Sequence, residues 1–448
     1  MTRKSPNRLL AALLVEAAWS AADLSRAVNA LGTAHGLQLR YDRTSVAHWL
    51  NGSRPRPPVA DLVRQALSRR IGRTLTTADT GFDEPEEAGD AVMAILKRND
   101  PVRRLTALCR ADIDPTRHAL LARSVHSALP PILTVWEKRS QTVPQTIGNG
   151  RQASSADAAR LETTASILAL MGEKYGGAHG RSALALYLSE DVVPLLTAPA
   201  RPEVRRALLT GAAHLTLLLA AMTSDVGHPA LAQHYYHVAL ELAHAAEERG
   251  AYAIALRCLS MQARRLGDHR QAVALGEAAL SVAGSAVPHA TRAFLHAGRA
   301  VVHAGVGQRR ASSADLAAAE KHLAQATGPE GPFTSYPQSA LRYQRAEVLS
   351  LLGDHKAAAA ELECSLGSRP ADHHKARALL HAQLAHTLLD TNEVEAAVGS
   401  CFRFLEHYEQ LATGSVHGAL PRLIQRLAPY RRNPRVRSFQ ERLHAMPP

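Results

Sequence analysis

Two stretches, LGDHRQA at residues 266–272 and LGDHKAA at residues 352–358, predict the fold of most of the chain. Each joins two apolar helical patterns. Its glycine permits a reversal of the chain, and its small residue, Ala272 or Ala358, lets the second helix pack closely. The two stretches lie 86 residues apart, which is two periods of 43. This spacing predicts repeated helical hairpins, because one hairpin cannot bury both of its faces, whereas a stack of hairpins shares a core.

Looser copies of the same turn occur at residues 226–229, 306–308 and 390–392. Successive turns are therefore separated by steps of about 40 to 46 residues, and we expect five hairpins. Aromatic residues make up only 4% of the chain, while alanine and leucine are abundant. We therefore expect an all-α fold, with a helical-hairpin superhelix over residues 156–448.

These repeats resemble tetratricopeptide (TPR) repeats. The positions that match the TPR pattern are Gly267, Asp268, Ala272, Ala279, Gly353, Asp354, Ala358 and Pro370. Gly276 stands where an aromatic residue is usual, and the period is longer than in TPR proteins, so the resemblance implies divergent repeats.

The TPR resemblance implies that the first helix of each pair lines a concave surface. Arg257, Arg264 and Arg265 would face this surface from one repeat, and Tyr343 and Glu347 from another. Arginines there would suit a peptide carboxylate or another acidic group of an effector. Ordinary ion pairs between repeats are the alternative for each of these side chains.

The stretch DRTSVAHWLNGSRPRPP, residues 42–58, predicts one short helix near the N-terminus. Asp42 is a candidate N-cap, and Asn51-Gly52 is a left-handed stop. Val46, Trp49 and Leu50 form the apolar stripe. The opposite side carries Arg43, Thr44, Ala47 and His48, and Arg54 and Arg56 follow the helix. Such a side suits a helix in the DNA major groove.

Further helices are expected at residues 7–19, from residue 20 onward, and at residues 59–71. The residues Ser45, Val46, Trp49 and Gly52, followed by Arg54, Pro57 and Pro58, resemble the corresponding stretch of phage-repressor-type (Xre-like) helix-turn-helix proteins.

The Xre-like resemblance implies that Arg43, Thr44 and His48 face base edges and that Arg54 and Arg56 lie beside phosphates. We expect Arg40 to contact phosphates as well, and Val46, Trp49 and Gly52 to seat the recognition helix. Leu24 and Val46 are 22 residues apart, about twice the separation usual in that family. The insertion, roughly Ala30–Tyr41, would lengthen the second helix or add a wing. The alternative is a small protein-interaction module with a basic face.

The formal charge of +12 is unevenly distributed. Residues 1–75 hold 12 Lys and Arg against 4 Asp and Glu, a net of +8, which leaves +4 for the other 373 residues. The basic partner-binding surface is therefore expected at the N-terminus, with double-stranded DNA as the partner. Arg431, Arg432, Arg435 and Arg437 form a further basic patch, for which solvation is the simpler interpretation and a contribution to nucleic-acid binding is the alternative.

We expect three regions: a helix-turn-helix domain at residues 1–82, a helical connector at 83–155 and the repeat domain at 156–448. Within the connector, residues 83–87 are acidic, and the polar stretch 141–155 is expected to be a flexible loop. The apolar run at residues 9–15 is at the lower length limit for the core of a signal sequence, and a helix buried in the first domain is the favoured interpretation. No other apolar run approaches membrane-spanning length, and no membrane association is expected.

Little in the sequence indicates catalysis. His237, Glu241 and His244 share a helical face with E-x-x-H spacing, but no matching second motif appears, so packing histidines are the favoured interpretation. The four cysteines lack metal-binding spacing and indicate reduced thiols of a cytosolic protein. No metal, cofactor or enzymatic activity is expected.

Together, the two resemblances are typical of bacterial transcriptional regulators, including many actinobacterial ones. We therefore expect a cytoplasmic, sequence-specific DNA-binding regulator that acts as a homodimer. Its repeats would mediate dimerisation or sense a peptide, small-molecule or protein effector. The alternative is a non-catalytic adaptor whose basic N-terminal module and repeats both bind proteins.

Overall fold

The computed structural model describes residues 6–34, 37–56, 58–72, 75, 77–82, 100–114, 118, 152–285, 287–327, 335–411 and 414–446. Every regular element within these ranges is a helix, and no strand occurs among them. The prediction of an all-α chain with a helical-hairpin superhelix is therefore confirmed. The acidic stretch at 83–87 and most of the polar loop predicted at 141–155 lie outside the described residues.

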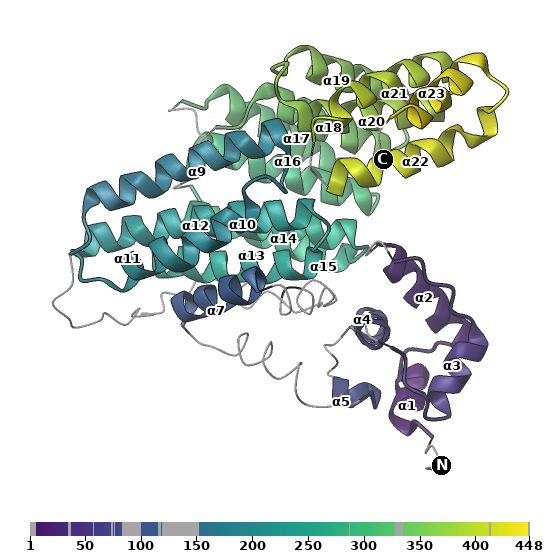
Figure 1. Ribbon diagram of the computed structural model, residues 1–448, viewed down its shortest axis with the longest axis horizontal. Coiled ribbons are helices and arrows are strands. Elements are labelled where there is room, and N and C mark those ends of the chain that lie inside the picture. The colour runs from purple at the N-terminus through teal and green to yellow at the C-terminus, as the bar shows by residue number, and fades with distance from the viewer. Residues whose placement is uncertain are drawn as a thin grey trace.

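The N-terminal domain is a small helical bundle (Figure 1). Its helices are α1 (Arg8–Glu16), α2 (Ala21–Ala34), α3 (Arg43–Leu50), α4 (Val59–Ile71) and α5 (Thr77–Thr80). One apolar core joins them, and residues such as Leu10, Leu24, Val46 and Leu62 are fully buried within it. Burial of these side chains is what stabilises helices this short, because isolated helices of such length are marginal in water.

The five predicted hairpins are present, and each turns at the predicted place. They are α12 (Pro202–Asp225) with α13 (Pro229–Ala245), α14 (Arg249–Arg265) with α15 (His269–Ala283), α16 (His289–Gly305) with α17 (Arg309–Ala324), α18 (Gln338–Leu351) with α19 (His355–Gly367), and α20 (His374–Asp390) with α21 (Val394–Tyr408). Three residues separate the two helices of every pair, so all five reversals share one length.

The Leu-Gly-Asp signature follows from the geometry of this turn. Gly267 has a φ of 78°, in the left-handed region, and its N–H and that of Asp268 donate to the last carbonyls of α14. The Asp268 carboxylate then accepts from the backbone N–H of Gln271 at 3.1 Å and caps α15. Asp354 caps α19 in the same way, at 3.1 Å from the nitrogen of Ala357. The glycine therefore reverses the chain, and the aspartate starts the next helix.

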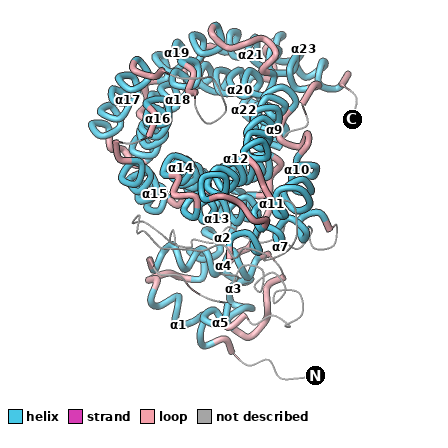
Figure 2. Tube along the Cα trace, turned by 90° about the vertical axis from the view of Figure 1, so that its left-hand side faces the viewer, coloured by secondary structure: helices cyan, strands magenta, loops and turns pink. Residues whose placement is uncertain are grey.

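The hairpins curl into a closed ring (Figure 2). The first helix of each pair lies on the inner side and the second lies outside. Helix α9 (Ser155–Tyr175) packs against both α12 and α20, and so joins the first hairpin to the last. The remaining elements are α7 (Pro101–Ile113), α10 (Arg181–Tyr187), η1 (Leu188–Val192) and α11 (Val193–Thr197) beside the first hairpin, and α22 (Gly414–Leu427), η2 (Ala428–Tyr430) and α23 (Pro434–His444) beyond the last.

Asp225, at the end of α12, makes polar contacts that close the ring. Its carboxylate accepts from the backbone N–H of Gly177 at 2.8 Å and lies 3.3 Å from the ammonium group of Lys375 in α20. It also accepts a hydrogen bond from the hydroxyl of Ser415 in α22. One buried carboxylate therefore holds the start of the array against its end.

Helix α12 is long and apolar enough to cross a membrane by length and composition, with a mean hydropathy of 1.5 over its best window. However, 67% of that window is buried inside the protein, where α12 packs between α9 and α13. The helix is therefore a core element of the ring, and its apolar character is explained by this packing.

Asp225→Ala is expected to destabilise the ring. The change removes the acceptor for the Gly177 N–H and leaves Lys375 without its partner, at a cost of about 3 kcal/mol in the free energy of unfolding. Chemical denaturation followed by circular dichroism measures the loss. The control is Asp372→Ala, which breaks an exposed pair with Lys174 and is expected to leave stability nearly unchanged. Equal effects of the two variants would contradict this role for Asp225.

Candidate nucleic-acid interface

Helix α3 begins and ends where its local sequence requires. Asp42 Oδ1 accepts from the backbone N–H of Ser45 at 2.8 Å, while Ser45 Oγ accepts from the Asp42 N–H at 3.4 Å, which makes a capping box. The Ser45 N–H and the Ser45 hydroxyl both donate to Asp42 Oδ1, and these two bonds lower the pKa of the Asp42 carboxyl because they favour its charged form. At the other end, Gly52 adopts a φ of 87°.

Trp49 holds α3 in its orientation. The side chain is 4% exposed and lies in the core beside fully buried Val46. Its ring packs on Tyr41, with the centroids 5.2 Å apart, and meets Phe82 edge-on at 6.4 Å. The apolar side of α3 therefore packs between Tyr41, which precedes the helix, and Phe82, at the end of the domain.

The insertion before α3 is a compact connection. Helix α2 extends to Ala34, and residues 37–42 return along it without forming a described strand. The Asn29 side-chain amide donates to the Tyr41 carbonyl at 2.8 Å, and its oxygen accepts from the Tyr41 N–H at 2.9 Å. Gly32 leaves room for Leu39, because a Cβ there would lie 2.5 Å from Leu39 Cδ1. The insertion thus lengthens the second helix and positions Tyr41 against Trp49.

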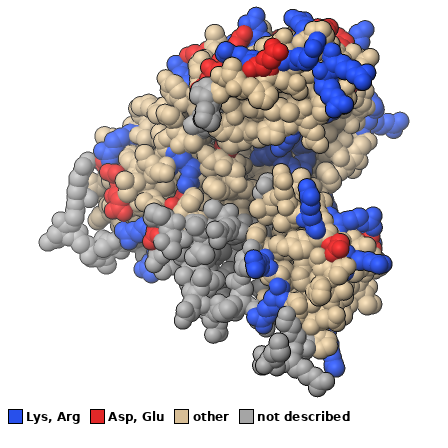
Figure 3. Space-filling view, turned by 45° about the vertical axis from the view of Figure 1, so that its right-hand side comes forward, with Lys and Arg blue, Asp and Glu red and all other residues tan. Residues whose placement is uncertain are grey.

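The side of α3 opposite Trp49 faces solvent. All six side chains predicted to contact DNA are exposed, namely Arg40, Arg43, Thr44, His48, Arg54 and Arg56. None of the five basic ones forms an ion pair with the residues that the structure describes. Figure 3 shows basic side chains distributed over this domain with few acidic ones among them. The surface therefore presents uncompensated positive charge around a polar helix.

Arg69, near the end of α4, joins this domain to the ring. Its guanidinium donates to the carbonyl of Leu266 at 2.5 Å and lies 3.9 Å from the carboxylate of Asp268. Arg270 also approaches the end of α4, since a Cβ on Gly72 would lie 3.3 Å from its Nη1. The α14–α15 turn therefore contacts the N-terminal domain at the end of α4.

The residues predicted to form an effector surface largely bind one another. Arg264 in α14 forms an ion pair with Glu347 in α18. Arg257 donates to the carbonyl of Phe294 at 2.9 Å and to the Gln344 side chain at 3.3 Å. These contacts join the inner helices α14, α16 (through Phe294) and α18. For Arg264 and Glu347, the alternative expectation of an ion pair between repeats is therefore the one that the structure shows.

Tyr343 lies beside Glu347 on α18, where burial raises the pKa of its phenol. Arg265, one residue beyond Arg264, is exposed and forms no ion pair with a described residue. Arg257, Arg264, Tyr343 and Glu347 thus lie close together on the inner side of the ring.

The candidate metal face is occupied by protein contacts. Glu241 Oε1 lies 2.7 Å from Arg104 Nη1 of α7, and burial raises the pKa of Glu241 to about 7. Burial lowers the pKa of His237 to about 3, and the His244 ring packs on Tyr252 with the centroids 6.2 Å apart. Among the described residues, no group of three His, Cys, Asp or Glu side chains is placed to hold a metal ion. Packing accounts for this face.

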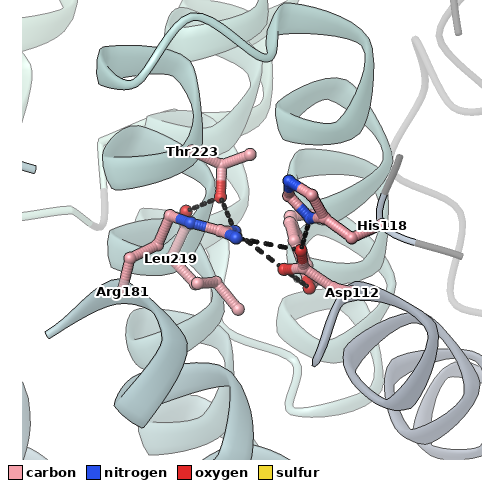
Figure 4. Close-up of polar contacts among 6 residues, drawn as sticks. Asp112, His118, Arg181, Leu219 and Thr223 are labelled. Carbon is pink, nitrogen blue, oxygen red and sulfur yellow. Dashed lines mark hydrogen bonds and ion pairs between the residues drawn. The ribbon is translucent and has the colours of Figure 1, made fainter. Parts of the chain in front are cut away.

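Figure 4 shows a buried polar cluster around Asp112, at the end of α7. No motif or spacing in the sequence predicted this cluster. Asp112 accepts two hydrogen bonds from Arg181 of α10, at 2.8 and 3.0 Å, and one from the Tyr235 hydroxyl of α13 at 2.7 Å. The Asp112 carboxylate also lies 2.7 Å from His118 Nδ1. Burial raises the pKa of Asp112, but the bonds from Arg181 and Tyr235 outweigh it and lower the net pKa. The cluster anchors α7 to the first hairpin.

Comparison with known proteins gives one local match. A family model described as the SP15 N-terminal domain matches residues 10–83. These bounds coincide closely with the N-terminal bundle from α1 to α5. No curated protein matches the chain.

Arg181→Met is expected to destabilise the first hairpin by about 3–5 kcal/mol, because it leaves the Asp112 charge buried without its guanidinium. Replacing both charges, in Asp112→Leu/Arg181→Met, should recover most of this loss. Denaturant unfolding at neutral pH compares the two variants. A double variant as unstable as the single one would contradict the interpretation.

The same cluster makes stability depend on pH. The pKa of Asp112 is lowered in the folded protein, so its stabilising effect is present above its ordinary value of 3.8 and is lost as the pH falls below that value. The double variant is therefore expected to lose less stability than the wild type between pH 5 and pH 3, measured by thermal unfolding.

Proposed function

We propose that the protein is a sequence-specific DNA-binding transcriptional regulator whose N-terminal domain is a helix-turn-helix reader. The observation that carries the proposal is the exposed polar side of α3, which is seated by Trp49 and surrounded by basic side chains that have no acidic partner among the described residues. A helix presented in this way suits the major groove, where arginine recognises guanine and the phosphates attract positive charge.

In this proposal, Arg43, Thr44 and His48 read base edges, since they lie on α3 itself. Arg40 precedes the helix and Arg54 and Arg56 follow it, so these three arginines flank α3 and contact phosphates. Val46, Trp49 and Gly52 position the helix and do not touch DNA. The match of residues 10–83 to one domain model supports treating this bundle as a module in its own right.

The repeat ring supplies regulation in the same proposal. The protein acts in the cytoplasm as a homodimer on two half-sites about one helical turn apart. The ring dimerises or binds a peptide, small-molecule or protein effector, with Arg257, Arg264, Tyr343 and Glu347 on its inner side. Hairpin α14–α15 carries Arg257 and Arg264 and also contacts Arg69 of α4. A ligand bound to this hairpin would therefore affect α4, which packs beside α2.

A second candidate function is a non-catalytic adaptor in which the basic module and the repeats both bind proteins. The stack of helical hairpins favours it, because such stacks offer extended binding surfaces. The two functions differ in one measurable property. Only the regulator is expected to retain a specific DNA fragment in the presence of excess nonspecific DNA.

Arg43→Ala and Arg54→Ala are expected to affect DNA binding differently. Loss of a bidentate base contact in Arg43→Ala should relax the sequence preference by about 1–3 kcal/mol at one position. Loss of a phosphate contact in Arg54→Ala should weaken binding to all sequences and reduce the salt slope by about one. Binding measured on genomic fragments selected by the wild-type protein, across a salt series, gives both quantities.

Arg103→Ala is the matched control, because Arg103 is an exposed arginine of α7, outside the N-terminal domain. It is expected to bind DNA like the wild type. If the wild type and the three variants all bind DNA equally and independently of salt, the DNA-binding proposal is wrong.

A further inference from the structure

The positive charge of the chain is concentrated in two segments. Residues 414–446 contain seven arginines and a single acidic residue, Glu441, which gives a formal charge of +6. The first 75 residues carry +8, so the rest of the chain has a net charge of −2. The C-terminal segment is therefore the second basic region of a protein that is otherwise slightly acidic.

This segment folds as α22, η2 and α23 at the end of the ring. Its apolar side chains Val416, Leu423, Leu427, Val436 and Phe439 are buried in the core of the last hairpins. The arginines are left on the outer side, and all seven are exposed: Arg422, Arg426, Arg431, Arg432, Arg435, Arg437 and Arg442. We call these seven residues the C-terminal arginine surface.

Only three of the seven have acidic partners among the described residues. Arg426 lies 2.6 Å from Asp390, Arg435 lies 3.4 Å from Glu395, and Arg442 lies 3.4 Å from Glu409. The other four, Arg422, Arg431, Arg432 and Arg437, form no ion pair with any residue that the structure describes. Like charges gathered in this way repel one another, and a polyanion would relieve that repulsion.

The C-terminal arginine surface and the N-terminal domain are reached from the same side of the molecule. Both lie at the right in Figure 1, and Figure 3, which brings that side forward, shows basic side chains gathered over the upper part and over the domain below. A duplex is long and uniformly charged, with one negative charge per about 1.7 Å of its axis. A duplex along this side would therefore present phosphates to both surfaces.

We infer that the C-terminal arginine surface binds the phosphate backbone of the DNA that flanks the segment read by α3. The inference rests on the proposed DNA-binding function and adds a second, sequence-independent contact to it. An anionic membrane fits the surface less well, because Ile424 is its one large exposed apolar side chain among the described residues. Phosphate suits the surface because the guanidinium group of arginine donates hydrogen bonds to phosphate oxygens as well as carrying positive charge.

The test compares the full-length wild type with Arg431→Ala/Arg432→Ala/Arg437→Ala on two DNA lengths. The probes are a short duplex that holds only the selected half-sites and a duplex extended by about two helical turns on each side. The triple variant should bind the short duplex like the wild type and the long duplex about tenfold more weakly, with a salt slope lower by about two to three. The matched control, Arg431→Lys/Arg432→Lys/Arg437→Lys, keeps the charge and should retain the binding to the long duplex.

Circular dichroism and gel filtration of both triple variants exclude misfolding. If the alanine variant binds the long duplex with wild-type affinity and salt slope, while Arg43→Ala still alters sequence preference, the inference is overturned and the DNA reader stands. If the wild type binds neither duplex, both proposals are overturned. If only the binding to phosphatidylglycerol vesicles falls in the alanine variant, the surface belongs to a membrane and the inference is wrong.

Discussion

The packing of Trp49 between Tyr41 and Phe82 is the constraint on which the candidate interface depends. This aromatic contact determines which side of α3 is buried, and hence which side carries its arginine, threonine and histidine toward solvent. The contact with Tyr41 also gives the insertion before α3 a structural role. Two hydrogen bonds between the Asn29 side chain and the Tyr41 backbone hold Tyr41 against Trp49. A helix of eight residues has little stability of its own, so its orientation comes from these neighbours.

Local features of the sequence predicted the repeat fold well. The Leu-Gly-Asp turns could be recognised because each residue has a separate backbone role: the leucine ends a helix, the glycine adopts a left-handed φ and the aspartate caps the next helix. The start and end of α3 were predictable for the same reason. Asp42 and Gly52 form their backbone and capping hydrogen bonds with residues at most four positions away in the sequence. Asn392 takes the glycine position in the last turn at a φ of 63°, which is why that copy was weaker.

Contacts between distant residues were not predictable from one sequence. Asp112 meets Arg181 and Tyr235 across 69 and 123 residues, and nothing in the spacing of these residues indicates that they pair. The link from Arg264 to Glu347 is of the same kind, because it requires knowing that α14 and α18 both line the inner side. The base and phosphate roles of the six residues around α3 remain predictions, because burial and charge identify the surface but not its ligand.

Closure of the array by Asp225 changes how the repeats can come apart. In an open solenoid each repeat touches only its neighbours, and melting begins at an unprotected end and spreads inward. Here the terminal hairpins support each other through α9 and the contacts of Asp225 with Lys375 and Ser415. Fraying at either terminus therefore also removes support from the opposite one, and the circle behaves as a single cooperative unit rather than as a row of independent modules.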